Sequence, residues 1–166
     1  MKKSIKTNVC RLLDAAGIAY ETLTYEVDES DLSVEHVAQQ LGLDAATVFK
    51  TLVLRGDRTG LLVCVVPGGT TVDLKKAATA SGNKKVEMLH QRELLPTTGY
   101  IRGGCSPIGM KKPLPTFIDE TCELWDAICV SAGQRGVQVR LSPGDLINYV
   151  GATVADLTEI DNNSIK

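Results

Sequence analysis

The sequence predicts a single α/β domain of the α+β kind, in which helices surround a mixed and largely antiparallel sheet. Apolar residues recur at helical spacing in some segments and alternate in others, and glycines or polar turns separate these segments. The chain has 166 residues, 43% of them hydrophobic, which is enough for one full core and short for two domains. We therefore expect one domain over residues 1–166, with a frayed polar tail over residues 161–166.

The first 42 residues predict two helices and a strand. Residues 9–16 carry apolar side chains at helical spacing and precede Gly17, which favours an N-terminal helix that ends at a glycine. Residues 18–25 then alternate as in a strand. A second helical pattern follows Ser33 and stops at Gly42, so we expect a helix with Ser33 as its N-cap.

The middle of the chain predicts a hairpin. Residues 48–55 and 61–67 are both rich in β-branched and aliphatic residues, and the turn 56–60 between them starts and ends with glycine. We expect these two strands at the centre of the sheet. The elements expected after the hairpin are a helix over 73–82 capped by Asp73, a strand over 86–88, a helical turn over 90–95, strands over 116–119, 127–130 and 137–141, and a final helix that starts at Ser142 with proline in its first turn.

A glycine-rich loop over residues 99–113 carries hydroxyl and cationic side chains, but neither an acid nor a histidine. Adjacent Gly103 and Gly104 allow positive φ, and Ser106 with the proline after it favours a turn behind them. Such a loop exposes backbone N–H groups, which bind a carboxylate, a phosphate or a developing oxyanion. The loop over 130–136 repeats this pattern, so we expect both loops at one pocket; the alternative is two ordinary tight turns.

Lys50 interrupts the apolar pattern of the first hairpin strand, with Val48 and Leu52 on its own face. Desolvation in such a place disfavours the charge unless an anionic partner is present. A ligand phosphate or oxyanion would be such a partner. Two structural alternatives remain: a lysine that reaches solvent at a sheet edge, or a lysine paired with Asp119.

The residue types for acid–base catalysis are scarce. The chain has only two histidines, His36 and His90, and both fall on predicted helix surfaces, which argues against a Ser–His–acid triad. The carboxylates show no paired spacing of the glycosidase kind. The groups that remain can stabilise anions; besides Lys50 they are the loop amides and the hydroxyls of Thr51, Ser106 and Ser131.

The composition argues against cofactors, membranes and DNA. Five cysteines form no CxxC pair and no metal-binding cluster, and no phosphate-binding glycine motif is present, so we expect neither metal nor organic cofactor. A net charge of −2 is unlike that of a protein that coats nucleic acid. An odd cysteine count, no secretory leader and no long apolar run predict a cytoplasmic protein.

Seven segments carry a resemblance to a known family; they are residues 24–26, 48–52, 73–76, 84–88, 98–112, 114–119 and 130–136. In their order and spacing they resemble the YbaK/EbsC family of aminoacyl-tRNA deacylases, over about residues 5–158. The resemblance implies hydrolysis of the ester that joins a wrong amino acid to the 3′ adenosine of a tRNA. It implies Cys-tRNA(Pro) as the substrate, and tRNA(Pro) and prolyl-tRNA synthetase as partners.

The resemblance also implies roles for individual residues. It places the catalytic positions at Lys50, Gly103 and Ser131, and substrate binding at Tyr25, Thr51, Tyr100, Gly104, Ser106, Gly133 and Arg135. The cysteine-specific members resemble substrate-assisted catalysts, in which the cysteinyl thiol attacks its own ester.

The sequence departs from the family pattern at some positions, and it also allows two alternative functions. Three positions depart from the pattern: Ala132 replaces a common glycine, Gln138 a common acid, and Cys105 an aliphatic residue that we expect to pack. The alternatives are a deacylase for another small amino acid, such as alanine, and a non-catalytic module that binds tRNA or a synthetase.

Overall fold

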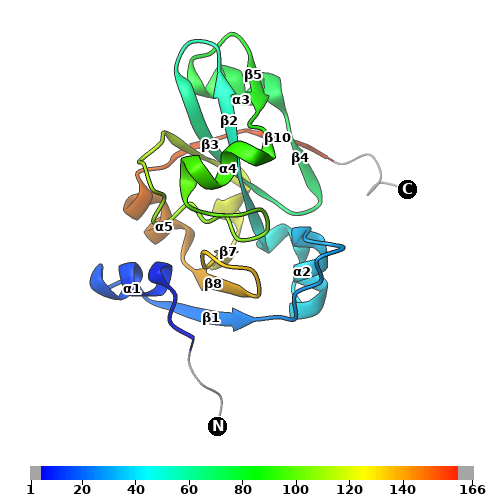
Figure 1. Cartoon of the computed structure of the whole chain (residues 1–166), viewed down its shortest axis with the longest axis vertical. Coiled ribbons are helices and arrows are strands. Elements are labelled where there is room, and N and C mark those ends of the chain that lie inside the picture. The colour runs from blue at the N-terminus through cyan, green and yellow to red at the C-terminus, as the bar shows by residue number, and fades with distance from the viewer. Residues whose placement is uncertain (1–4, 161–166) are drawn as a thin grey trace.

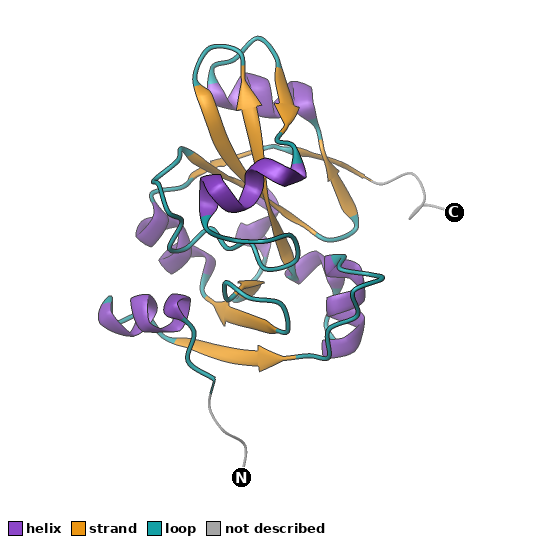
Figure 2. Cartoon of the chain, viewed as in Figure 1, coloured by secondary structure: helices purple, strands orange, loops and turns teal. Residues whose placement is uncertain are grey.

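The computed structural model describes residues 5–160, so the predicted tail over 161–166 lies outside the described residues. Helices lie around the strands, as the sequence predicts (Figures 1 and 2). The helices are α1 (Asn8–Ala15), α2 (Val34–Leu41), α3 (Leu74–Ser81), α4 (Gln91–Thr98) and α5 (Pro143–Val150), with 3₁₀ turns η1 (Ala45–Thr47) and η2 (Glu120–Leu124). The strands are β1 (Tyr20–Thr24), β2 (Phe49–Gly56), β3 (Gly60–Pro67), β4 (Thr70–Val72), β5 (Val86–Met88), β6 (Thr116–Asp119), β7 (Ile128–Ser131), β8 (Val137–Leu141), β9 (Thr153–Ala155) and β10 (Thr158–Ile160).

The strands form three sheets instead of the single sheet expected. The largest has five strands in the order β5-β2-β3-β6-β9, and it is mixed, because β3–β6 and β6–β9 pair in parallel. A three-stranded antiparallel sheet, β1-β8-β7, occupies the lower half of Figure 1, and β10 pairs with β4. The two larger sheets meet at one parallel bridge, between Val48 and Cys129. The mixed, largely antiparallel character is therefore confirmed.

The predicted hairpin lies at the centre of the molecule. Strands β2 and β3 pair along their whole length, from Phe49 opposite Pro67 to Gly56 opposite Gly60. Alternate residues of β3 enter different cores: Val63 and Val65 pack with α1 and α5, whereas Leu62, Cys64 and Val66 pack with α3. A strand that is covered on both faces has a nearly continuous apolar sequence, and residues 61–67 have such a sequence.

The predicted helix boundaries are confirmed where a capping residue marks them. The Ser33 hydroxyl accepts a hydrogen bond from the His36 N–H, and the Asp73 carboxylate accepts two from Lys75 and Lys76. Gly42 and Gly82 take the left-handed conformation after their helices. Where local signals are weak the structure differs: β1 (Tyr20–Thr24) is shorter than the expected strand 18–25, because the turn after α1 covers residues 16–17 and pairing with β8 starts only at Tyr20.

Two further differences have local causes. The helical turn expected over 90–95 continues to Thr98 as α4, even though Pro96 lies inside it. Beyond the proline, the Thr98 hydroxyl and the Gly99 N–H donate to carbonyls of the preceding turn, and these bonds extend the helix. Strands β4, β9 and β10 have three residues each, too few to show a period of two in the sequence.

Asn83 ties the tip of the central hairpin to the end of α3. Its Oδ1 accepts hydrogen bonds from the Arg58 and Thr59 N–H groups, both at 2.9 Å, and its Nδ2 donates to the Thr59 and Ser81 hydroxyls. The amide lies directly over Gly56, where an added Cβ would fall 2.3 Å from Nδ2. This contact requires glycine at position 56.

We expect Asn83→Ala to destabilise the fold by about 2–4 kcal/mol, because it removes four partly buried hydrogen bonds that hold the hairpin tip against α3. The midpoint of thermal unfolding should fall by roughly 5–15 °C, as followed by circular dichroism. The matched control is Asn148→Ala, an exposed helix position, which should shift the midpoint by no more than about 2 °C. Equal shifts in the two variants would contradict the role given to Asn83.

Candidate active site

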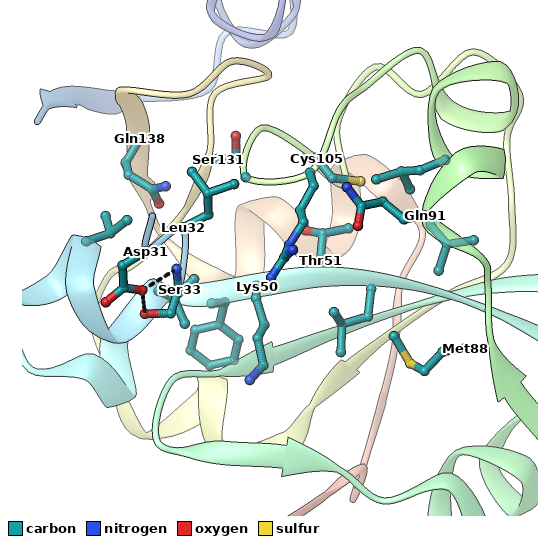
Figure 3. A pocket seen from close by; sticks show the side chains of 18 of the residues that line it. Asp31, Leu32, Ser33, Lys50, Thr51, Met88, Gln91, Cys105, Ser131 and Gln138 are labelled. Atoms are coloured by element: carbon teal, nitrogen blue, oxygen red, sulfur yellow. Dashed lines mark hydrogen bonds between the residues drawn. The ribbon is translucent and has the colours of Figure 1, made fainter. Parts of the chain in front are cut away.

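A cavity of about 460 Å³ opens beside the central strand β2. Its walls come from five parts of the chain: the segment before α2, strand β2, the β5–α4 junction, the loop after α4, and strands β7 and β8. Figure 3 shows side chains from these parts turned toward one another. Segments far apart in the sequence thus meet at one place, which is the geometry that a binding site for a small group requires.

Five residues expected at the site line this cavity: Tyr25, Lys50, Thr51, Gly103 and Ser131. Gly103 comes from the first glycine loop and Ser131 from the start of the second, so the two loops do reach one pocket. Gly103 has a φ of 84°, and the nearest atom to a Cβ there would be Arg135 Nε at 3.3 Å. The positive φ favours glycine at position 103.

The other five expected residues lie outside the cavity lining and hold the two loops in place. The Tyr100 hydroxyl donates to the Ile108 carbonyl, and the fully buried Ser106 hydroxyl accepts from the Ile108 N–H at 3.2 Å. The Gly133 N–H donates to Ser131 Oγ at 3.1 Å. These bonds form within the protein and shape the two loops.

Gly104 and Arg135 join the two loops to each other. A Cβ on Gly104 would lie 3.1 Å from the Gln134 Cα, so glycine allows the backbones to touch. The Gly104 N–H donates to the Ile101 carbonyl at 2.9 Å, and it is therefore not the free amide that the sequence suggested. Arg135 Nε donates to the Arg102 carbonyl at 2.8 Å, directly before Gly103.

The Lys50 ammonium reaches across the hairpin to strand β4. Its Nζ donates to the Thr70 carbonyl at 2.9 Å, and the side chain is half-buried. The pairing with Asp119 considered from the sequence is wrong, because that carboxylate accepts hydrogen bonds from Leu157 and Thr121. Among residues 5–160 no carboxylate lies within salt-bridge distance of Lys50. Its positive charge is available to an anionic ligand.

The Cys105 thiol and the Ser131 hydroxyl are two of the cavity's possible nucleophiles, and neither is activated. Burial raises the pKa of the Cys105 thiol to about 12, so this group stays protonated and weakly nucleophilic near neutral pH. Ser131 Oγ accepts from the Gly133 amide, and neither of the two histidines of the chain lines the cavity. Without a base, a serine hydroxyl is a poor nucleophile.

Two polar oxygens of the lining are buried and have no hydrogen-bond partner among residues 5–160: Thr51 Oγ1 and Gln138 Oε1. The Thr51 and Gln138 residues are 9% and 3% exposed. A buried polar atom that lacks a partner costs free energy, so it usually marks a place where a ligand or water binds. The sequence indicated Thr51, but it gave Gln138 only as a departure from the family pattern.

Other lining residues were not expected from the sequence. They are mostly apolar or lie in segments without a recognisable motif, and they include Leu32, Met88, Gln91 and Leu94. Among the described residues, no group of three or more His, Cys, Asp or Glu side chains is arranged to hold a metal ion. None of the described helices is long and apolar enough to cross a membrane.

Comparison with known families gives this cavity a context. Residues 28–149 match the family described as the aminoacyl-tRNA editing domain. The chain belongs to this family. It is 48% identical to the Enterococcus faecalis protein named "Putative Cys-tRNA(Pro)/Cys-tRNA(Cys) deacylase EbsC" over 157 residues. These residues make up 95% of this chain and 96% of the relative. The resemblance seen in the sequence is thereby confirmed.

Two more distant similarities agree with the family. A proline–tRNA ligase from Shouchella clausii is 28% identical over 113 residues, which are 68% of this chain and 20% of the ligase. A crystal structure described as that of "a putative trans-editing enzyme for prolyl tRNA synthetase" superposes with a TM-score of 0.80 at 27% identity. The superposition covers 94% of this chain and 99% of the other. The fold is therefore that of the editing domains.

Proposed function

We propose that this protein is a trans-editing deacylase, which hydrolyses the ester of Cys-tRNA(Pro) and releases free tRNA. The observation that carries the proposal is a cavity that combines, within the described chain, a cation without a carboxylate partner, a glycine loop, two unsatisfied polar oxygens and a Cys105 thiol that stays protonated. Membership in the editing family and 48% identity to the EbsC protein support the substrate class. A substrate that brings its own nucleophile fits such a cavity.

The chemistry needs only groups that the substrate and the cavity supply. The cysteinyl thiol attacks its own ester carbonyl, so a C–S bond forms and the bond to the tRNA 3′ oxygen breaks. The thiol proton passes to that oxygen, and the first products are tRNA and a cyclic thioester. Water then opens the thioester to cysteine. The protein contributes orientation and donors for the developing oxyanion, which together are worth several kcal/mol.

Lys50 and Gly103 are the proposed sources of that stabilisation. The Lys50 charge lies in a half-buried position without a carboxylate partner in the described chain, where an added anion is attracted more strongly than in water. Gly103 brings its loop backbone to the cavity wall at positive φ. Ser131, on the neighbouring strand β7, is proposed to contact the substrate and to keep its loop closed through the Gly133 amide.

The proposed partners are tRNA(Pro) and prolyl-tRNA synthetase, and the proposed location is the cytoplasm. The synthetase that mischarges a tRNA produces the substrate of a trans-editing protein. The similarity to a segment of a proline–tRNA ligase supports this pairing. A protein that edits cytoplasmic tRNA acts in the same compartment.

A deacylation assay with one tRNA(Pro) charged separately with cysteine, alanine and proline tests the proposal. We expect Cys-tRNA(Pro) to be hydrolysed at least about 100-fold faster than Pro-tRNA(Pro), because proline has no thiol to attack the ester. Spontaneous hydrolysis of each ester is the blank. Faster release of alanine than of cysteine would instead assign the protein to alanine editing, and no release above the blank would make it a binding module.

The Cys105 thiol provides a separate prediction. Since burial raises its pKa to about 12, it is neutral across the working range, and Cys105→Ala should keep the deacylation rate within about threefold of the wild type. The rate profiles of the two proteins between pH 6 and 9 should have the same shape. The matched control is Cys64→Ala, a buried thiol in the core away from the cavity. A loss of activity specific to Cys105→Ala, or an acyl group trapped on it, would make this thiol a catalyst.

A further inference from the structure

Strand β2 has a break in its hydrogen-bonding ladder, and the break lies at the cavity. On one edge β2 pairs with β3 along its whole length. On its other edge, β5 pairs only with Leu54 to Gly56, and β7 meets the chain only at Val48. In the part of the chain that the structure describes, no strand therefore covers that edge between Phe49 and Val53. The cavity lining includes this stretch of β2.

The direction of the backbone groups identifies the residue at the break. The Leu89 N–H donates to the Val53 carbonyl at 3.0 Å, so the backbone of Val53 points toward the β5 edge. In a strand, the N–H and C=O of alternate residues point to the same edge. The backbone of Thr51 therefore also points to this edge, into the break, whereas Lys50 and Leu52 bond to β3.

The side chain of Thr51 indicates that a ligand fills this place. Thr51 is 9% exposed, and its Oγ1 has no hydrogen-bond partner within the described structure. Figure 3 shows Thr51 leaving β2 on the side of Cys105, opposite to the side on which Lys50 leaves. Backbone groups at an open ladder position and an unpartnered hydroxyl thus occur in the same residue. A polar ligand that enters the break could bond to both.

We propose that the aminoacyl group of the substrate pairs with Thr51 as a single strand residue. In an α-aminoacyl ester the amino donor and the carbonyl acceptor are joined through one Cα, as are the N–H and C=O of a single residue in a protein chain. The amino group donates to the Thr51 carbonyl, and the ester carbonyl accepts from the Thr51 N–H, as in a closely spaced antiparallel pair. This pairing fixes the ester at the cavity and selects α-amino acids, whatever their side chain. It rests on the proposed function.

The test uses a stable analogue, an adenosine whose 3′ oxygen is replaced by an amide nitrogen that carries cysteine. The second analogue carries 3-mercaptopropionyl in place of cysteinyl, so it keeps the thiol and lacks the amino group. Binding of both to the full-length protein is measured by calorimetry. Amide hydrogen exchange of Thr51 and Leu52 is measured by NMR on ¹⁵N-labelled protein. Neither readout requires turnover.

We expect the cysteinyl analogue to slow exchange of the Thr51 amide at least about tenfold, while the Leu52 amide, already bonded to β3, does not change. The analogue without the amino group should bind about 10- to 100-fold more weakly, because it leaves the Thr51 carbonyl unpaired. Thr51→Val keeps the backbone groups, so the ratio of the affinities for the two analogues should not change. Gln138→Leu removes the other unpartnered oxygen of the cavity and should retain it as well.

Several results would overturn the proposal. They are no saturable binding of the cysteinyl analogue, unchanged exchange of the Thr51 amide at saturation, and equal affinity for the two analogues. Loss of the affinity ratio in Gln138→Leu would assign the amino group to Gln138 instead. A protein that protects Thr51 with the analogue but does not hydrolyse Cys-tRNA(Pro) would disprove the proposed function and leave the pairing intact, so the two failures are distinguishable.

Discussion

Replacing Lys50 with alanine is expected to lower the rate constant for deacylation of Cys-tRNA(Pro) by about 100- to 1,000-fold, as removal of one preorganised electrostatic donor does in other enzymes. The ammonium is half-buried beside the cavity, and its one hydrogen bond in the described structure is to the Thr70 carbonyl. A neutral side chain there cannot offset the charge that develops on the ester oxygen. Single-turnover assays with radiolabelled Cys-tRNA(Pro) measure this step.

Two variants separate charge from structure. Lys50→Met keeps most of the apolar stem and removes the charge, so it should lose activity as Lys50→Ala does. Lys75→Ala removes an exposed lysine of α3 and should keep the wild-type rate. Circular dichroism should show that all three variants fold. A folded Lys50→Met protein with near-wild-type turnover would remove Lys50 from the catalytic site.

Changing the substrate thiol to a hydroxyl is expected to have a comparably large effect. Ser-tRNA(Pro) has nearly the shape of Cys-tRNA(Pro), but its hydroxyl is a much weaker nucleophile near neutral pH. We expect the enzyme to hydrolyse it at least about 100-fold more slowly at saturating enzyme, in the same single-turnover assay. The spontaneous rate of each ester is subtracted.

The affinity for the two substrates gives the control for this comparison. If serine is rejected at the chemical step, both substrates should saturate the enzyme at similar concentrations, because the cavity contacts are shared. A protein nucleophile or an enzyme-bound water would act on either ester. Equal rates for the two substrates would therefore contradict substrate assistance.

Much of the fold follows from local signals in the sequence. Ser33 and Asp73 cap their helices, and the glycine-bounded turn 56–60 fixes the central hairpin. The division into separate sheets could not be predicted, because it depends on β7 meeting the chain only at Val48, just before β2, while β5 pairs only with the far end of β2. Such pairings join residues tens of positions apart, and no local pattern encodes them.

The candidate site was predictable where an unusual residue type stands in a regular pattern. Lys50 interrupts an apolar strand, and Gly103 and Ser131 stand in glycine-rich loops; all three line the cavity. The same loops suggested a free backbone amide at Gly104, which instead packs against the second loop. In a sequence, a glycine needed for close packing cannot be distinguished from one needed for binding. Apolar wall residues such as Leu94 look like core residues, so only the tertiary structure places them at a cavity.

The identity of the first amino-acid product tests the central claim most directly. Cys-tRNA(Pro) is mixed with excess enzyme, quenched in acid within the first turnover, and analysed by mass spectrometry. Attack by the substrate thiol predicts a cyclic thioester, lighter than cysteine by one water, which appears first and then decays to cysteine. Release of free cysteine from the earliest time point, without the thioester, would show that water or a protein group attacks the ester and would contradict this account.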